Sequence, residues 1–243
     1  MKTARKAILL VLCAILLVVS AVMGTLAYLT DTEAVTNTFT VGKVDITLDE
    51  FDYDNDDNEN DNTTVNGEPR DKANEYHLLP GGTYKKDPTV TVADGSEEAY
   101  VFMTVTVKNL TNLKSALPEN KFPGYYSNGI FLLQNLCDWQ ADSPWLFAGY
   151  KDVVADGAAT TDGEYRFYYN ATPAGGTAGN RLPALFTEIT VPGADITTQT
   201  MPLLKDVEIN VEAVAIQKAG FNTANDAWKA QFNEEYIIAP VAP

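Results

Sequence analysis

The sequence predicts an all-β protein, a jelly-roll-like β-sandwich with one short C-terminal helix and an N-terminal signal or apolar helix. Short runs of alternating or β-branched residues recur along the chain. Clusters of Gly, Pro, Asn and Asp separate them, a pattern typical of sandwiches and jelly rolls. A single capped helical pattern stands near the C-terminus. The chain has 243 residues, which is a normal length for one large all-β domain behind a leader.

The N-terminus has the pattern of an export signal. A basic head precedes an unbroken apolar run from Ala7 to Met23, and the basic residues are Lys2, Arg5 and Lys6. Because small residues end the run, the pattern predicts a signal peptide over residues 1–27, cleaved between Ala27 and Tyr28. The mature protein is then secreted or placed at the cell surface. An uncleaved anchor formed by residues 7–29 is the alternative, since about 20 apolar residues span a bilayer.

The charge balance is strongly acidic, with 33 Asp and Glu against 17 Lys and Arg and a formal net charge of −16 at pH 7. Nucleic-acid binding depends on Lys and Arg that neutralise phosphates, so no nucleic-acid partner is expected. Outside the leader Cys137 is the single cysteine, so no internal disulfide is expected. Because Cys137 stands between Leu136 and Trp139, it is predicted to be a buried, inert thiol.

The strand predictions follow the alternating runs from the N-terminal side onward. In the first run the alternation slips at Gly42-Lys43, as it does at a β-bulge. Turn-forming residues bound each run, which keeps the strands short. The predicted strands are Phe39–Leu48, Thr89–Val92, Tyr100–Val107, Ile130–Leu133, Trp145–Tyr150, Tyr165–Tyr169, Phe186–Val191 and Val207–Ile216.

Residues 50–66 form an acidic stretch with little apolar content, which predicts a solvated loop. Carboxylates of this kind are ligands for Ca²⁺, a hard cation that prefers oxygen. The stretch fails as an EF-hand, because Glu59 takes the glycine position and Val65 the last ligand position. Weak Ca²⁺ binding is one interpretation and a plain solvated loop is the other. The candidate calcium ligands are Asp52, Asp54, Asp56 and Asp57.

One helix is predicted after the last strand. Thr223 and Asp226 have the spacing of a capping box, with the threonine as N-cap. Ala227, Trp228 and Phe232 follow at helical spacing. The helix is expected to close one end of the sandwich.

Several segments together resemble a known family. The first is the leader end, Gly24–Asp31, together with the first strand region, Asn37–Ile46. The second is Leu79–Val90, and the third is Val211–Gln217, which leads into the predicted helix. Together they look like the TasA/camelysin family, and the resemblance covers nearly the whole chain. The first segment is the most specific, because leader and first strand occur together.

The resemblance implies an exported jelly-roll sandwich that polymerises into extracellular biofilm-matrix fibres. A dedicated signal peptidase, SipW, would process the leader, and an accessory fibre protein would be a further partner. In such fibres a segment of one subunit completes the sheet of the next. That implies three parts: the signal peptide, a donor segment over residues 28–41, and a sandwich domain over residues 42–243. Mapped onto this chain, the donor residues are Thr30, Thr32, Val35, Phe39 and Val41.

Two alternatives remain beside the fibre subunit. For residues 28–38 the alternative to a donor strand is a frayed terminus. For the domain the alternative is a non-polymerising cell-surface adhesin or carbohydrate-binding module. Aromatic residues that stack on sugars or fill a core are Trp139, Trp145, Phe147, Tyr150, Phe167, Tyr168 and Tyr169.

An enzyme is not expected, although camelysin is labelled a metallopeptidase. Catalytic zinc takes several His or acidic ligands, and this chain has one histidine, His77, and no His-Glu-x-x-His pattern. His77 is therefore predicted to be an ordinary surface or half-buried residue. No catalytic residue and no cofactor, apart from weakly bound Ca²⁺, is predicted.

Overall fold

The computed structural model describes most of the chain downstream of the leader. The described residues are 31–33, 44–54, 63–72, 74, 76, 79–122, 126–127, 130–131, 133–139, 142–154, 161–193, 196–205 and 207–236. The predicted signal peptide and the predicted bulge at Gly42-Lys43 lie outside these residues.

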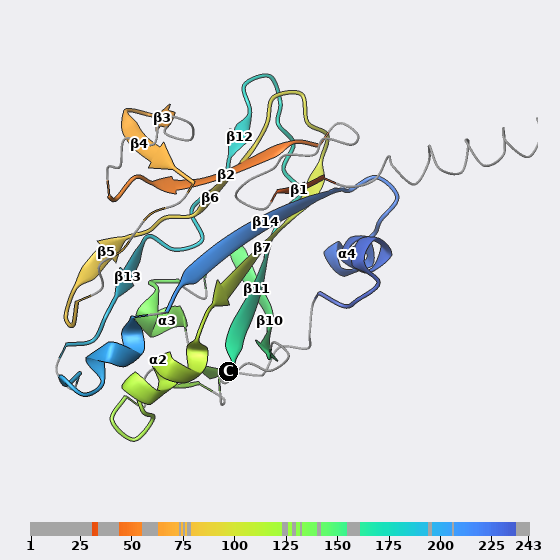
Figure 1. Cartoon of the computed structure of the whole chain (residues 1–243). Coiled ribbons are helices and arrows are strands. Elements are labelled where there is room, and N and C mark those ends of the chain that lie inside the picture. The colour runs from red at the N-terminus through yellow and green to blue at the C-terminus, as the bar shows by residue number, and fades with distance from the viewer. Residues whose placement is uncertain are drawn as a thin grey trace, which may run out of the picture.

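The first sheet has five strands in the order β1-β14-β7-β11-β10, all paired antiparallel (Figure 1). Its centre is the long pair β7 and β14, which stay in register from Ala99–Gln217 at one end to Val107–Ile209 at the other. The strands are β1 (Asp31–Glu33), β7 (Ala99–Val107), β10 (Trp145–Val153), β11 (Asp162–Tyr169) and β14 (Ile209–Gln217).

The second sheet also has five strands, in the order β12-β6-β2-β4-β3. They are β2 (Ile46–Phe51), β3 (Thr63–Val65), β4 (Glu68–Asp71), β6 (Thr89–Val92) and β12 (Asn180–Arg181). Two small sheets pair β5 (Thr83–Lys85) with β13 (Glu188–Thr190) and β8 (Tyr126–Ser127) with β9 (Ile130–Phe131).

One apolar core joins the two large sheets. Ile46 and Val90 of the second sheet belong to the same buried cluster as Met103, Val105 and Ala213 of the first. Each of these side chains is fully buried. Burying one such Val or Ile side chain stabilises the fold by about 1.5–3 kcal/mol, so this core holds the sheets together. The predicted all-β class is confirmed.

The helical elements among the described residues are α2 (Leu110–Ala116), α3 (Leu133–Leu136), the 3-10 helix η2 (Met201–Leu204) and α4 (Ala224–Phe232). The predicted cap of α4 is confirmed, because the Thr223 hydroxyl accepts a hydrogen bond from the Asp226 N–H at 3.1 Å.

α4 does not close an end of the sandwich as predicted; it packs on the outer face of the first sheet (Figure 1). Successive residues of a strand face opposite sides, so Phe102 points outward where Met103 points into the core. Phe102 and Ile216 form a second buried cluster with Trp228 of α4 and with Tyr236 beyond it. β7 and β14 are therefore apolar on both faces where α4 covers them, whereas Asn210 and Glu212 of β14 stay exposed.

Three local predictions differ from the structure. In the described part of the predicted strand Phe39–Leu48, Val44 and Asp45 precede the strand, and β2 begins at Ile46. The predicted strand Ile130–Leu133 is shorter, because β9 ends at Phe131 and α3 begins at Leu133. The predicted loop 50–66 is partly sheet: β2 runs to Phe51, and β3 pairs with β4 across a tight turn. Asn66 and Gly67 form that turn with φ of 54° and 85°. An Asn-Gly pair is the residue choice that such a hairpin turn requires.

Candidate functional site

The edge of the first sheet is the part of the structure that bears on the predicted donor segment. β1 lies on this edge and pairs with β14 in its own chain (Figure 1). Asp31 stands opposite Ala215 and Glu33 opposite Ala213. β14 has nine residues and β1 has three, so in the part of the chain that the structure describes, β1 covers only a third of this edge.

Of the predicted donor residues, the structure describes Thr32, which stands opposite Val214. Thr30, Val35, Phe39 and Val41 lie outside the described residues, as do the predicted cleavage residues Ala27 and Tyr28 and the histidine His77.

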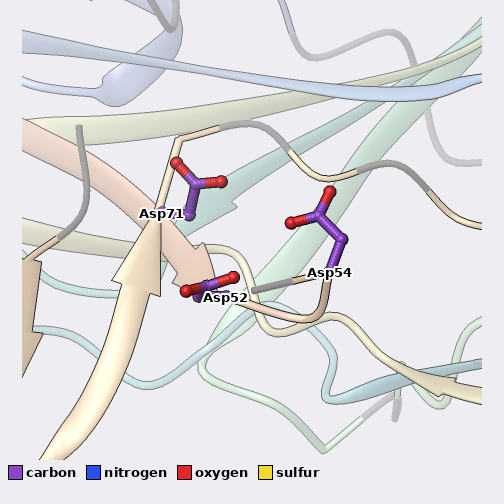
Figure 2. A group of neighbouring side chains, drawn as sticks. All are labelled: Asp52, Asp54 and Asp71. Atoms are coloured by element: carbon purple, nitrogen blue, oxygen red, sulfur yellow. The ribbon is translucent and has the colours of Figure 1, made fainter. Parts of the chain in front are cut away.

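Two of the four calcium candidates lie together with a third carboxylate that the sequence did not single out. Asp52, Asp54 and Asp71 each offer one carboxylate oxygen, and these oxygens lie within 4.8 Å of one another (Figure 2). Asp52 follows β2 and Asp71 ends β4, so pairing of these two strands brings the carboxylates together. Asp56 and Asp57 lie outside the described residues.

Asp52 and Asp71 are almost completely buried, whereas Asp54 is half-buried. The Asp71 carboxylate accepts a hydrogen bond from the Lys72 N–H at 2.5 Å. Acidic side chains gather in many proteins for reasons other than an ion, so we do not assign these carboxylates as metal ligands. Weak Ca²⁺ binding stays a prediction from the sequence.

Beside the three aspartates, the second sheet holds a buried ion-pair network. Arg70 is 2% exposed, and its guanidinium donates to Asp49 and Asp87 at 2.8 Å each. Arg181 also donates to Asp49, at 2.8 Å. Burial alone would lower the pKa of Arg70, but its hydrogen bonds to Asp87 and Asp49 raise it above the ordinary arginine value. Arg70 therefore holds two acidic side chains as a buried, charged structural unit.

A second buried pair lies close by. The Lys86 ammonium donates to Glu50 Oε2 at 2.5 Å, and both side chains are 8% exposed. Glu50 Oε1 accepts a hydrogen bond from the side-chain amide of Asn74 at 2.8 Å. Sequence reasoning missed this group, since no motif links three residues that lie on β2, after β4 and after β5.

The predicted aromatic set mainly fills the core. Trp145 and Phe167 are buried, and Trp139 is 9% exposed. The Trp145 indole N–H donates to the Pro183 carbonyl at 2.8 Å, so its polar atom is satisfied internally. Tyr168 is partly buried against the second cluster. The aromatic side chains that are partly buried against the main core are Phe147, Tyr150 and Tyr169.

Cys137 lies in the main core as predicted. Burial raises the pKa of its thiol above the ordinary range, because the thiolate would be charged in an apolar environment. The thiol is therefore an inert packing group under physiological conditions.

Comparisons with known proteins give no match. No family model, no curated protein and no solved structure matches this chain. Among the described residues, no helix is both long and apolar enough to cross a membrane.

Proposed function

We propose that this protein is a secreted structural subunit that polymerises into extracellular matrix fibres by strand donation. Its fold in this proposal is a jelly-roll-like sandwich, and its main partner is another copy of itself. A dedicated signal peptidase releases the donor segment 28–41, and an accessory fibre protein is a further partner. The observation that carries the proposal is the pairing of β1 with the edge of β14.

The register of that pairing fits the predicted donor segment. Asp31 pairs with Ala215 and Glu33 with Ala213. A donor strand that kept this register would set Val35 opposite Val211 and Asn37 opposite Ile209. A strand that begins near Tyr28 therefore has the length to cover the whole of β14.

The side-chain alternation supports the same assignment. Directly paired residues of an antiparallel ladder face the same side of the sheet. Val211 and Ala213 belong to the main core, so a donor strand in this register would turn Val35 toward that core. Phe39 and Val41 keep the same parity. Strand addition of this kind draws affinity from main-chain hydrogen bonds and register from alternate side chains.

In the single chain, β1 occupies its own sheet edge. A fibre requires β1 to leave this edge and to pair with β14 of a neighbour, which is an exchange of an identical element between subunits. Because the donor and the accepting edge are different surfaces, the contact is heterologous and grows an open filament. In the part of the chain that the structure describes, three residues of β1 pair with β14, and these pairings must break for the exchange.

The test uses the mature chain that begins at Tyr28, after N-terminal sequencing of secreted material has located the cleavage site. Deletion of residues 28–38 is expected to leave a folded monomer that forms no filaments by electron microscopy. Val35→Pro is expected to act in the same way, because proline removes a donor N–H from the ladder. Salt is expected to promote assembly, because it screens repulsion between acidic subunits.

A matched control is Val154→Pro, at an exposed position just after β10 and away from the β14 edge. It is expected to polymerise like the wild type. Filaments of the deleted chain that are identical to those of the mature chain would show that strand donation is wrong. If neither chain polymerises at any salt concentration, the non-polymerising adhesin or carbohydrate-binding module becomes the better proposal.

A further inference from the structure

Glu50 holds a lysine and an asparagine on the two oxygens of one carboxylate. Lys86 Nζ donates to Oε2 at 2.5 Å, and Asn74 Nδ2 donates to Oε1 at 2.8 Å. A nucleophilic amine, an amide and a proton-transfer group are thus brought together by three separate elements. Glu50 lies on β2, Asn74 follows β4, and Lys86 follows β5.

The Asn74 amide is fixed and polarised by its hydrogen bonds. Its Oδ1 accepts from the Tyr53 N–H at 2.6 Å and from the Asp54 N–H at 3.4 Å. Its Nδ2 also donates to the Phe51 carbonyl at 3.0 Å. Main-chain N–H groups aimed at a carbonyl oxygen stabilise the negative charge that develops there during nucleophilic attack.

The surroundings exclude water from the pair. The Glu50 and Lys86 side chains are each 8% exposed, and the centre of the Tyr76 ring lies 5.3 Å from Lys86 Nζ. Tyr76 stacks on Tyr53 with ring centroids 5.0 Å apart and meets Tyr84 edge-on. The hydrogen bond from Nζ to Oε2 gives a direct path along which Lys86 can pass a proton to Glu50.

We propose that Lys86 and Asn74 become joined by an intramolecular isopeptide bond, formed with Glu50 as the proton carrier. It is an autocatalytic modification of this chain, independent of the fibre proposal.

The reaction needs no oxidant and no co-reactant. Lys86 Nζ, after giving a proton to Glu50, forms a bond to Asn74 Cγ, and the negative charge collects on Oδ1. The bond between Cγ and Nδ2 then breaks. Glu50 returns the proton to the leaving nitrogen, which departs as ammonia and takes up the second proton that Nζ loses. The ammonium side chain and the amide become one secondary amide and one ammonium ion, and Glu50 is unchanged.

The chain contains an internal comparison. Lys229 and Asn225 both donate to the Glu235 carboxylate beside α4, so the same three residue types meet a second time. That group is open to solvent, with side-chain exposures of 59% for Lys229 and 49% for Glu235. Water stabilises its charged forms, so the second group is expected to stay unlinked.

The experiment is peptide mapping of the purified mature chain after incubation at neutral pH. The intact mass is expected to fall by about 17 Da, the mass of one ammonia. Digestion with trypsin is expected to give a branched peptide in which residues 73–85 are joined to residues 86–108. The mass loss alone does not identify the link, because ring closure at Asn66-Gly67 would also release ammonia. Only the isopeptide bond gives a branched peptide.

Two variants test the role of Lys86 as the amine and the role of Glu50 as the proton carrier. Lys86→Arg keeps the cation but removes the amine, and Glu50→Gln keeps hydrogen bonding but cannot carry the proton. Lys86→Arg is expected to abolish the link, because no amine remains to attack Asn74. Glu50→Gln is expected to lower the linked fraction at least about tenfold, since general acid–base catalysis contributes ~10²–10⁴-fold in rate. Lys229→Arg is the matched control and leaves the link intact.

A wild-type chain that keeps its full mass and yields no branched peptide would overturn the proposal, whatever the variants do. A link that persists in a folded Glu50→Gln chain would overturn the role of Glu50. A branch at Lys229 and Asn225 of equal yield would show that burial does not select the site.

Discussion

Loss of the Tyr236 hydroxyl is expected to destabilise the whole domain, although this residue lies beyond the last helix. Tyr236 is fully buried. Its hydroxyl lies 2.7 Å from the Met103 carbonyl and 3.0 Å from the Phe167 carbonyl, and it accepts from the Phe167 N–H at 3.2 Å. These hydrogen bonds join Tyr236, which follows α4, to β7 and β11 at the centre of the first sheet.

The size of the effect follows from what each substitution removes. Tyr236→Phe leaves buried main-chain groups without their partner, which costs about 1–3 kcal/mol. Tyr236→Ala also removes a ring that lies 4.9 Å from Phe102 and 4.3 Å from Trp228. Replacing a large buried aromatic side chain by alanine costs ~3–5 kcal/mol, so the second variant is expected to be the less stable.

The assay is urea denaturation of the mature chain, followed by tryptophan fluorescence. Tyr53→Phe is the matched control. Tyr53 is 40% exposed, so loss of its hydroxyl should change the free energy of unfolding by less than about 0.5 kcal/mol. Equal denaturation midpoints for Tyr236→Phe and the wild type would refute the assigned role of the hydroxyl.

The remaining predictions concern charged groups. Arg70→Met removes the buried cation between Asp87 and Asp49 and leaves Asp49 with Arg181. It is expected to lower the free energy of unfolding by about 3–5 kcal/mol, measured in urea; an unchanged free energy would mean that the fold does not depend on this buried cation. Burial would raise the pKa of Asp162, but hydrogen bonds from the Asn109 N–H and a lysine lower it below its ordinary value. Asp162 therefore stabilises the fold above its unfolded pKa, and this contribution is lost as pH falls through the lower, folded pKa. Urea midpoints of Asp162→Asn and the wild type should differ at pH 7 and converge in acid; a constant difference would contradict the linkage.

Local patterns predicted the long, regular elements well. β6 has the predicted bounds, and β7 and β14 begin and end within two residues of them. Alternation and β-branched residues signal such strands directly. The Thr223 cap predicted α4 because its chemistry is local.

Elements that depend on tertiary burial were missed. α2 begins after Asn109, which has φ of 52° and makes no side-chain cap, and it includes Thr111 and Asn112. Those residues are poor helix formers, so the helix depends on burial of Leu110 and Leu113 in the core. No local signal reports such burial in advance.

The same limit applies to the candidate sites. Asp71 joins Asp52 and Asp54 because β4 pairs with β2, and Asn74 and Lys86 come together at the Glu50 carboxylate from separate parts of the chain. The acidic stretch signalled carboxylates near Asp52, but sequence spacing does not report which distant residues will meet them.

β7 has a consequence for how this protein can vary. It lies between β14 and β11 and is covered on both faces, by the main core at Met103 and by the second cluster at Phe102. A strand with one exposed face accepts substitutions on its solvent side, but six of the nine positions of β7 are buried, and Phe102 and Met103 pack in two different interiors. A change of volume at Phe102 would require repacking around α4, and a change at Met103 would require repacking between the sheets. β7 is thus a segment in which homologous chains have little freedom to drift.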